Sequence, residues 1–357
     1  MKLNKIIAAL LALVMVLGLA ACGSSAPAAT EAPKAEAPAA TEAPAATEAP
    51  AYEYQEVTLG WATTSSEGTI VVDAMHEFAD RIAEATGGNV KIDLYPGSQL
   101  GSAVDTLEQV QMGALAMANT QPTHLANIGA KEMTVLSMPY LFTSFDQRWE
   151  VIYGEIGEDL LQCATDKAEG VIGFSYYGDG ARHFFTNFPV ESVADMAGKK
   201  VRVQDTTLDN AWCKALKASP TPTASSEMYA AMSSNLVDAA EQPIANYYAS
   251  KFYEVSQYLI LDGHTYNTIT VAFSEAIWNT LDVELQTLLK DTWNDIMSEK
   301  KQEIVDAEAD FIKLIEAEGV KVSTPTDLAD WSAAMADVYT EFGVGIEDYI
   351  ARIQAVK

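Results

Sequence analysis

Arginine is the residue type whose placement in this sequence is most informative. Five arginines accompany 50 Asp and Glu residues in the 357-residue chain: Arg81, Arg148, Arg182, Arg202 and Arg352. A guanidinium group offers two parallel N–H donors in one plane, which match the two oxygens of a carboxylate. Arg81 and Arg148 lie in charge-rich helical stretches, and we expect both at the surface.

Arg182 and Arg202 are the candidates for binding a carboxylate ligand. Arg182 follows the segment GDGA (178–181) at the predicted end of a strand, and ligands of α/β proteins usually bind at such strand ends. Arg202 lies between Val201 and Val203 and points away from their apolar face. The alternative is that both arginines form structural ion pairs, for which an acidic chain has many partners.

Residue patterns typical of enzymes are missing from the sequence. The four histidines have no His-Glu-x-x-His spacing, and neither a Gly-x-Ser-x-Gly segment nor a phosphate-binding glycine loop occurs; they are His76, His124, His183 and His264. Cys163 and Cys213 lie in helical patterns, which favours buried free thiols over a disulfide or a metal site. We therefore predict no enzymatic activity, no cofactor and no metal.

The net charge excludes some partners. A formal charge of −28 at pH 7 repels nucleic acids and anionic lipid surfaces. With 49% hydrophobic residues, the chain is also long enough for two domains with apolar cores.

The N-terminal segment reads as a secretory signal. Lys2 and Lys5 precede an apolar run over 6–17, and Leu-Ala-Ala then leads to Cys22. This run is too short for a spanning helix, and a cysteine in this position resembles the lipid-modified cysteine of bacterial lipoproteins. The alternative is an ordinary cleavage site beside a chance cysteine. We predict a signal peptide over 1–21 and lipidation of Cys22, which anchors the protein outside the cytoplasm.

A low-complexity tether follows. Thr-Glu-Ala-Pro recurs at 30–33, 41–44 and 47–50, and large apolar side chains are absent from 23–51. Such a segment cannot bury a core, so 22–53 is predicted to be an extended spacer between the anchor and a globular body.

Alternating strands and helices begin at residue 56. The predicted strands are 56–61, 90–94, 115–118, 171–177, 200–204, 237–240 and 264–273. Apolar residues at helical spacing predict helices over 71–85, 208–218, 226–233 and 282–318. This alternation predicts an α/β class with a mainly parallel sheet. The last helix would be on the order of 50 Å long, enough to brace two lobes unless it breaks near 300–301.

Several ordered motifs resemble the solute-binding proteins of TRAP transporters (tripartite ATP-independent periplasmic transporters), of the C4-dicarboxylate-binding type. They are GGNVKIDLYPGSQLG (87–101), VQMGALAMA (110–118), MPYLF (138–142), GARHFFTN (180–187), MAGKKVRVQ (196–204) and ASPTPTASSEMYAAMSSNLVDAAEQP (218–243). The resemblance implies a two-lobed periplasmic-binding-protein fold of type II, with hinge strands and a long helix that braces both lobes. It implies lobe I over 54–179 and 268–307, and lobe II over 180–267 and 308–357.

The resemblance also implies a ligand site between the lobes. Arg202 takes the place of the family's carboxylate-clamping arginine in K-x-R-V, and Arg182 that of a second arginine in G-x-R. Gln242 replaces the Asn of the family's E-N-P motif, and Ser225 replaces a frequent aromatic residue, so the identity of the acid stays open. The first lobe is expected to contribute four residues of the same cleft: Thr64, Glu67, Asn119 and Gln121. Tyr140 is either a wall of the cleft or part of the core.

The function implied by the resemblance is capture of a small organic acid outside the cytoplasm. A monomeric, lipid-anchored protein would close its lobes on the acid and deliver it to the small and large membrane subunits of a TRAP permease. The alternative is a binding protein that presents its ligand to a membrane sensor kinase.

Overall fold

The computed structural model describes residues 52–357. The predicted signal peptide, the lipidated Cys22 and nearly all of the predicted tether lie outside these residues. Among the residues described, no helix is both long and apolar enough to cross a membrane.

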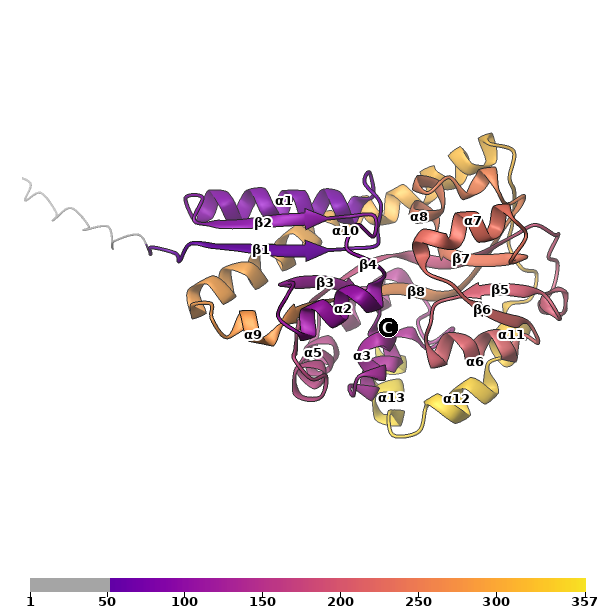
Figure 1. Cartoon of the computed structure of the whole chain (residues 1–357). Helices are drawn as coiled ribbons and strands as arrows, with labels where there is room; N and C mark the ends of the chain where they lie inside the picture. The colour runs from indigo at the N-terminus through magenta and orange to yellow at the C-terminus, as the bar shows by residue number, and fades with distance from the viewer. Residues whose placement is uncertain (1–51) are drawn as a thin grey trace, which may run out of the picture. The chain divides into compact units, whose positions relative to one another are not determined.

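Nine strands form one mixed sheet in the order β2-β1-β3-β8-β4-β7-β5-β6, and β9 pairs with β8 (Figure 1). Their bounds are β1 Val57–Ala62, β2 Val90–Tyr95, β3 Met117–Thr120, β4 Val171–Thr186, β5 Lys200–Val203, β6 Ser219–Pro222, β7 Ala239–Pro243, β8 Tyr258–Ser274 and β9 Lys321–Ser323. Strands β1, β2 and β3 are parallel to one another, as are β5, β6 and β7. The predicted parallel order therefore holds in each of these two groups.

Two long antiparallel strands, β4 and β8, join the two parallel groups. The carboxyl-terminal part of β8 pairs with β3, whereas the carboxyl-terminal part of β4 pairs with β7. Both strands are longer than the sequence pattern predicted. Their pairing has three register shifts, and the one between Gly178 and Ala181 carries it past the GDGA segment. Each strand thus belongs to both halves of the sheet.

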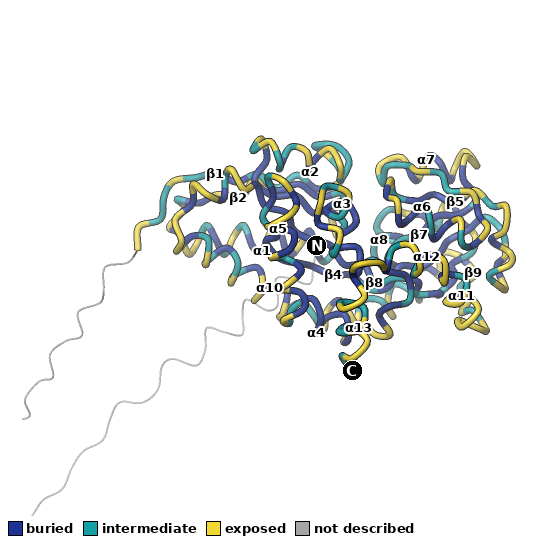
Figure 2. The backbone as a smooth tube through the Cα atoms, turned by 90° about the horizontal axis from the view of Figure 1, so that it is seen from below, coloured by how far each residue is buried: buried dark blue, intermediate teal, exposed yellow. Residues whose placement is uncertain are grey.

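Helices cover both halves of the sheet, and its central strands β3, β8, β4, β7 and β5 are buried along most of their length (Figure 2). The first half carries α1 Ile70–Ala85, α2 Ala103–Gln111, α3 Pro122–Asn127, the 3₁₀ helix η2 Lys131–Ser137, α4 Phe145–Ile152, α5 Glu155–Lys167 and α9 Glu275–Trp278. The second half carries η3 Val193–Met196, α6 Thr207–Ala215, η4 Ser225–Glu227, α7 Met228–Ser233, α8 Ile244–Ala249 and η5 Phe252–Glu254. At the start of α2, Ser102 and Asp105 form a reciprocal capping box, which satisfies backbone donors that a helix start leaves unpaired.

The long helix is continuous. Helix α10 spans Val283–Ala317, 35 residues without a break near 300–301. Its first part packs Trp293 against Trp61, with ring centroids 4.8 Å apart, in the core of the first half. Its last part places Ile315 in the core that contains Phe185 and Tyr247 of the second half. One helix therefore packs against the cores of both halves, as the sequence pattern predicted.

The chain ends with α11 Leu328–Ala333, α12 Ala336–Phe342 and α13 Glu347–Ala355. Arg352 of α13 forms an ion pair with Asp159 of α5 at 2.6 Å, and the Gln147 amide of α4 donates to the Ile353 carbonyl at 3.0 Å. The last helix thus contacts helices of the first half, although 308–357 was assigned to lobe II. The exact lobe boundaries stay a prediction.

Arg148 is not a surface residue, which corrects the prediction. Its side chain is fully buried, lies 4.6 Å over the Phe145 ring and donates to the Asp179 carbonyl at 2.8 Å. Burial lowers its pKa to about 10. A Cβ at Gly178 would lie 1.1 Å from Arg148 Nη1, so the missing side chain makes room for the guanidinium. The charges that flank Arg148 lie on other faces of α4, and this misled the sequence-based prediction.

The predictions for Arg81 and for the two cysteines are confirmed. Arg81 lies at the surface, where it pairs with Glu77 and Glu299. Cys163 and Cys213 are buried free thiols.

Candidate functional site

A small polar cavity of about 60 Å³ lies where strand ends of the two halves meet. Parallel strands present their carboxyl ends at the same edge of a sheet, and there the chain turns away and exposes polar groups. Strands β1, β3, β5 and β7 each contribute residues at or just beyond this end. The lining consists of Thr64, Ser65, Ser66, Gln121, Tyr177, Arg182, Arg202, Gln204, Ser225, Gln242, Asn246, Ser250, Asn267 and Ile269. Hydroxyl, amide and guanidinium groups from both halves of the sheet therefore line the cavity.

Arg202, on β5, is buried and only partly hydrogen-bonded. Its side chain is 3% exposed, and Nε donates to the Thr223 carbonyl at 2.9 Å. Nη1 has no hydrogen-bond partner among the described residues, and the nearest carboxylate oxygen, Glu241 Oε1, is 3.8 Å away. At that distance the attraction is Coulombic without a hydrogen bond. Burial, together with the neighbouring Arg182, lowers the pKa of Arg202 to about 10, so the group stays charged at pH 7.

Arg182 also lines the cavity, but all its donor nitrogens have partners. Nε and Nη2 donate to the two carboxylate oxygens of Glu241, the second at 2.8 Å. Nη1 donates to Asn267 Oδ1 at 2.8 Å. Burial acts to lower the pKa of Arg182, but the Glu241 charge outweighs it and the pKa is raised. Arg182 thus forms the structural ion pair that the sequence left open as an alternative.

The position of Arg182 also differs from the prediction. It lies inside β4, opposite Thr265 and Pro243 on the neighbouring strands, and not at a strand end. The register shifts on either side of it allow the strand to continue through the glycine-containing segment.

Glu241 is the centre of a buried ionic network. Although burial alone would raise the pKa of this carboxyl, Arg182 and His264 hold it at about 2. His264 Nε2 lies 3.6 Å from Glu241, and its Nδ1 lies 2.7 Å from Asp262. Burial opposes protonation of His264, but these two carboxylates raise its pKa to about 9. The network fixes Arg182 and leaves one edge of Arg202 toward the cavity.

Several of the predicted ligand residues line the cavity together. Thr64 and Gln121 come from the first half, and Ser225 and Gln242 from the second. With Arg202 they form a set of hydrogen-bonding groups around one small space. Their contact with a ligand stays a prediction.

Three predicted residues lie outside this lining. Glu67 is exposed and hydrogen-bonds His76 at 3.4 Å. Asn119 is buried in the core, where Trp61 Nε1 donates to its Oδ1 at 2.8 Å. Tyr140 is half-buried and packs against the core: its amide donates to the His264 carbonyl at 2.7 Å, and its hydroxyl donates to Asp262 at 3.4 Å. We do not include these residues in the candidate site.

The sequence-based reasoning missed other lining residues. Gln204 follows β5 directly, so the rule that ligands bind at strand ends could have indicated it. Asn267 lies inside β8 beside Arg182, and no local pattern marks it. Glu241 lies in the motif over 218–243, but no role was predicted for it, because its partners Arg182 and His264 lie 59 and 23 residues away in the sequence.

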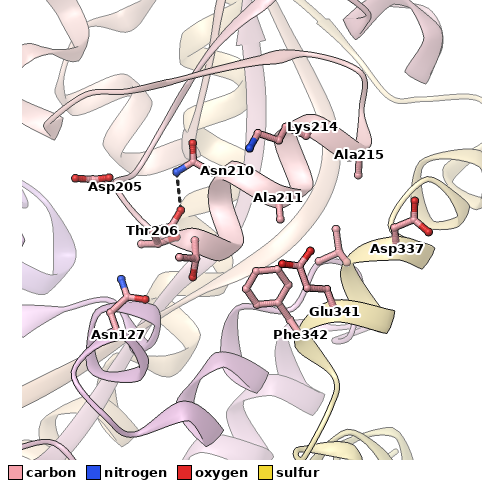
Figure 3. Close-up of a pocket in the computed structure, with 12 residues that line it drawn as sticks. Asn127, Asp205, Thr206, Asn210, Ala211, Lys214, Ala215, Asp337, Glu341 and Phe342 are labelled. Carbon is pink, nitrogen blue, oxygen red and sulfur yellow. Dashed lines mark hydrogen bonds between the residues drawn. The ribbon is translucent and has the colours of Figure 1, made fainter.

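A larger groove of about 620 Å³ lies elsewhere, between α3, α6 and α12 (Figure 3). Asp205, Asp337 and Glu341 line it, with Lys214 on α6. None of the predicted ligand residues lines this groove, and no arginine does. Its charge is unsuited to a carboxylate, so size alone does not identify the site.

Comparisons with known proteins identify the family of the chain. Residues 61–344 match the family model described as bacterial extracellular solute-binding protein, family 7. A solute-binding protein of Chromohalobacter salexigens is 31% identical over 273 residues, which are 75% of this chain and 80% of the relative.

Solved structures extend this similarity to the fold. A TRAP periplasmic solute-binding protein from Bradyrhizobium, in complex with D-galacturonate, has 31% identity and a TM-score of 0.79 over 84% of this chain and 99% of its own. One from Sulfurospirillum deleyianum with bound succinate has 28% identity and a TM-score of 0.79 over 85% of this chain and 100% of its own. Both bound molecules are carboxylates.

Proposed function

The chain belongs to family 7 of the bacterial extracellular solute-binding proteins, the solute-binding proteins of TRAP transporters, and we propose that it delivers a captured organic acid to a TRAP membrane permease. Members of this family bind substrates for transport outside the cytoplasm and are not enzymes. The fold is their two-lobed α/β fold, as the sequence motifs predicted.

The observation that carries the proposal is the state of Arg202. A buried guanidinium whose Nη1 has no hydrogen-bond partner within residues 52–357 is an unfavourable arrangement. A ligand carboxylate would satisfy the edge of Arg202 that Glu241 does not reach. The surrounding hydroxyl and amide side chains, such as Ser225 and Gln242, would bind the rest of a polar acid.

The origin of the lining residues supports closure of the two lobes on the ligand. Thr64 and Gln121 belong to one half of the sheet, Arg202 and Gln242 to the other, and β4, β8 and α10 connect the halves. A ligand that contacts both halves favours the closed arrangement over open ones. Bending would concentrate in β4 and β8, where the register shifts interrupt regular pairing.

Delivery and anchoring form the finer part of the proposal. The family pairs its binding proteins with a membrane permease of two subunits, and the Leu-Ala-Ala-Cys22 sequence supports a lipid anchor on the outer face of the membrane. Fractionation of cells that produce Cys22→Ala tests the anchor. We expect the variant to leave the membrane fraction, and its retention there in high salt would contradict lipidation.

A thermal-shift screen tests the binding function. Ligand that binds the folded state raises the melting temperature, so D-galacturonate, D-gluconate, D-erythronate and succinate are compared with their methyl esters. We expect at least one acid to raise the melting temperature, and its ester, which lacks the charge, to have no effect. If acid and ester act alike, the carboxylate is not what the protein recognises.

A further inference from the structure

A second cavity adjoins the small one at Arg202. Its volume is about 340 Å³, several times that of the first, and four residues line both cavities: Thr64, Arg202, Gln204 and Ser225. We call the two spaces the inner cavity and the outer chamber. A ligand whose carboxylate binds Arg202 in the inner cavity has the outer chamber directly beside it.

The outer chamber combines apolar and polar walls from both halves of the sheet. Ala103 and Val104 come from the first turn of α2, and Pro222 and Ala224 lie between β5 and α7 in the sequence. His124 of α3 adds an imidazole ring, whose Nδ1 lies 3.0 Å from Thr120 Oγ1. Burial lowers the pKa of His124 to about 4, so the ring is neutral at pH 7 and adds no charge to the chamber.

The charged residues of the outer chamber have the opposite sign to Arg202. Asp105, Asp205 and Glu227 line the chamber, and none of them lines the inner cavity. Arg202 is the cation shared by both spaces, and among the described residues no lysine lines either of them. Arg182, the other cation of the inner cavity, is already paired with Glu241. A ligand with a second carboxylate at its far end would therefore meet three like charges and no free cation.

Ser225 is one of the four residues that line both spaces. Its side chain is small and offers a hydroxyl, whereas a large side chain at this position would fill part of the space beside Arg202.

From this arrangement we propose that the outer chamber is a second ligand subsite, which holds the uncharged far end of a long monocarboxylic acid whose carboxylate binds Arg202. The inference rests on the proposed function and narrows it: the ligand is a monocarboxylate too long for the inner cavity and not a dicarboxylate. The competing interpretation is that the chamber is only the entrance to the inner cavity.

Titration calorimetry with a graded set of acids tests the charge of the far end. D-Glycerate is short, D-gluconate and D-galactonate have six carbons and one carboxylate, and D-glucarate and galactarate carry a carboxylate at both ends. We expect the better six-carbon monocarboxylate to bind at least tenfold tighter than both glycerate and its own dicarboxylate. A dicarboxylate that binds as tightly as its monocarboxylate would overturn the proposal.

A large side chain placed in the outer chamber tests whether long acids extend into it. Val104→Trp narrows a wall that belongs only to the outer chamber, and Val305→Trp is the matched control, because Val305 is also 39% exposed and lies on α10 away from both cavities. We expect Val104→Trp to lower the affinity for the six-carbon monocarboxylate at least tenfold, whereas its affinity for glycerate stays within threefold of that of the unsubstituted protein. Val305→Trp should change neither affinity.

If Val104→Trp lowers the affinity for short and long acids equally, or changes neither affinity, the chamber is only an entrance. If Arg202→Lys leaves the affinity for every acid unchanged, the proposed carboxylate site itself is wrong. This outcome differs from a failure of the outer subsite alone, in which Arg202→Lys still lowers the affinity.

Discussion

Arg182 and Arg202 are both buried at the same junction, and both face Glu241, yet their surroundings differ. Arg182 lies inside β4, where Glu241 and Asn267 occupy its donors. Arg202 lies near the end of β5, where one backbone carbonyl accepts from Nε and Nη1 has no partner within residues 52–357. Burial alone does not separate a structural arginine from a binding one. The hydrogen-bond partners do: Glu241 and Asn267 occupy all three nitrogens of Arg182, whereas Arg202 Nη1, unpaired among the described residues, is free to bind a ligand carboxylate.

Among the substitutions that test this contrast, Arg182→Ala should have the largest effect, a decrease in the free energy of unfolding. The substitution leaves the buried Glu241 carboxylate without its main partner, and such losses cost about 3–5 kcal/mol. Equilibrium unfolding in urea should show a decrease of that size in the free energy of unfolding. A decrease below about 1 kcal/mol would contradict the structural role of Arg182.

Arg202→Lys should affect binding instead of folding. Lysine keeps the charge but has no pair of parallel donors, so we expect the lower end of the same range, about 3 kcal/mol, or roughly a hundredfold loss of affinity. Titration calorimetry with the acid found in the screen measures it, and the free energy of unfolding should stay within about 1 kcal/mol of the unsubstituted protein. Affinity within threefold of that protein would make Arg202 structural too.

Acid should weaken the network around Arg182. The pKa of Glu241 is about 2 in the folded protein, below its value of about 4.3 when unfolded. The carboxylate therefore contributes stability above about pH 4.3, and this contribution is lost as the pH falls toward 2, on the order of 2–3 kcal/mol in total. Unfolding curves between pH 5 and 2 measure the slope. Glu241→Gln should remove this part of it, and an unchanged slope in the variant would refute the assignment.

Arg81→Ala is the surface counterpart and should have the smallest effect. Arg81 pairs with Glu77 and Glu299 in contact with solvent, and its own side chain is 36% exposed. Water screens such pairs, so we expect a loss of about 0–1 kcal/mol in the free energy of unfolding. A loss as large as that of Arg182→Ala would show that burial does not govern the contrast.

Local sequence patterns predicted the class of this fold and part of its strands and helices. Helical spacing of apolar residues predicted α10 within one residue at each end, because a long amphipathic helix is specified by its own period. The family resemblance pointed to Arg202, Gln121 and Gln242, and all three line the cavity. The strand-end argument was applied to Arg182, which lies inside β4. The charge and the missing catalytic patterns agreed with a transport protein.

Tertiary structure decided which charged residue has which partner. Arg148 is buried because Gly178, thirty residues later, leaves space for its guanidinium. Arg182 is paired because β7 brings Glu241 beside β4, and Asn119 is withdrawn from the cleft by its hydrogen bond to Trp61. These contacts join segments far apart in the chain, so no local period carries them. The sequence by itself determined that Arg202, Thr64, Gln121, Ser225 and Gln242 belong to one site-lining set. The packing of β4, β7 and β8 decided that Arg182 is bound to Glu241, whereas Arg202 Nη1 has no partner within residues 52–357.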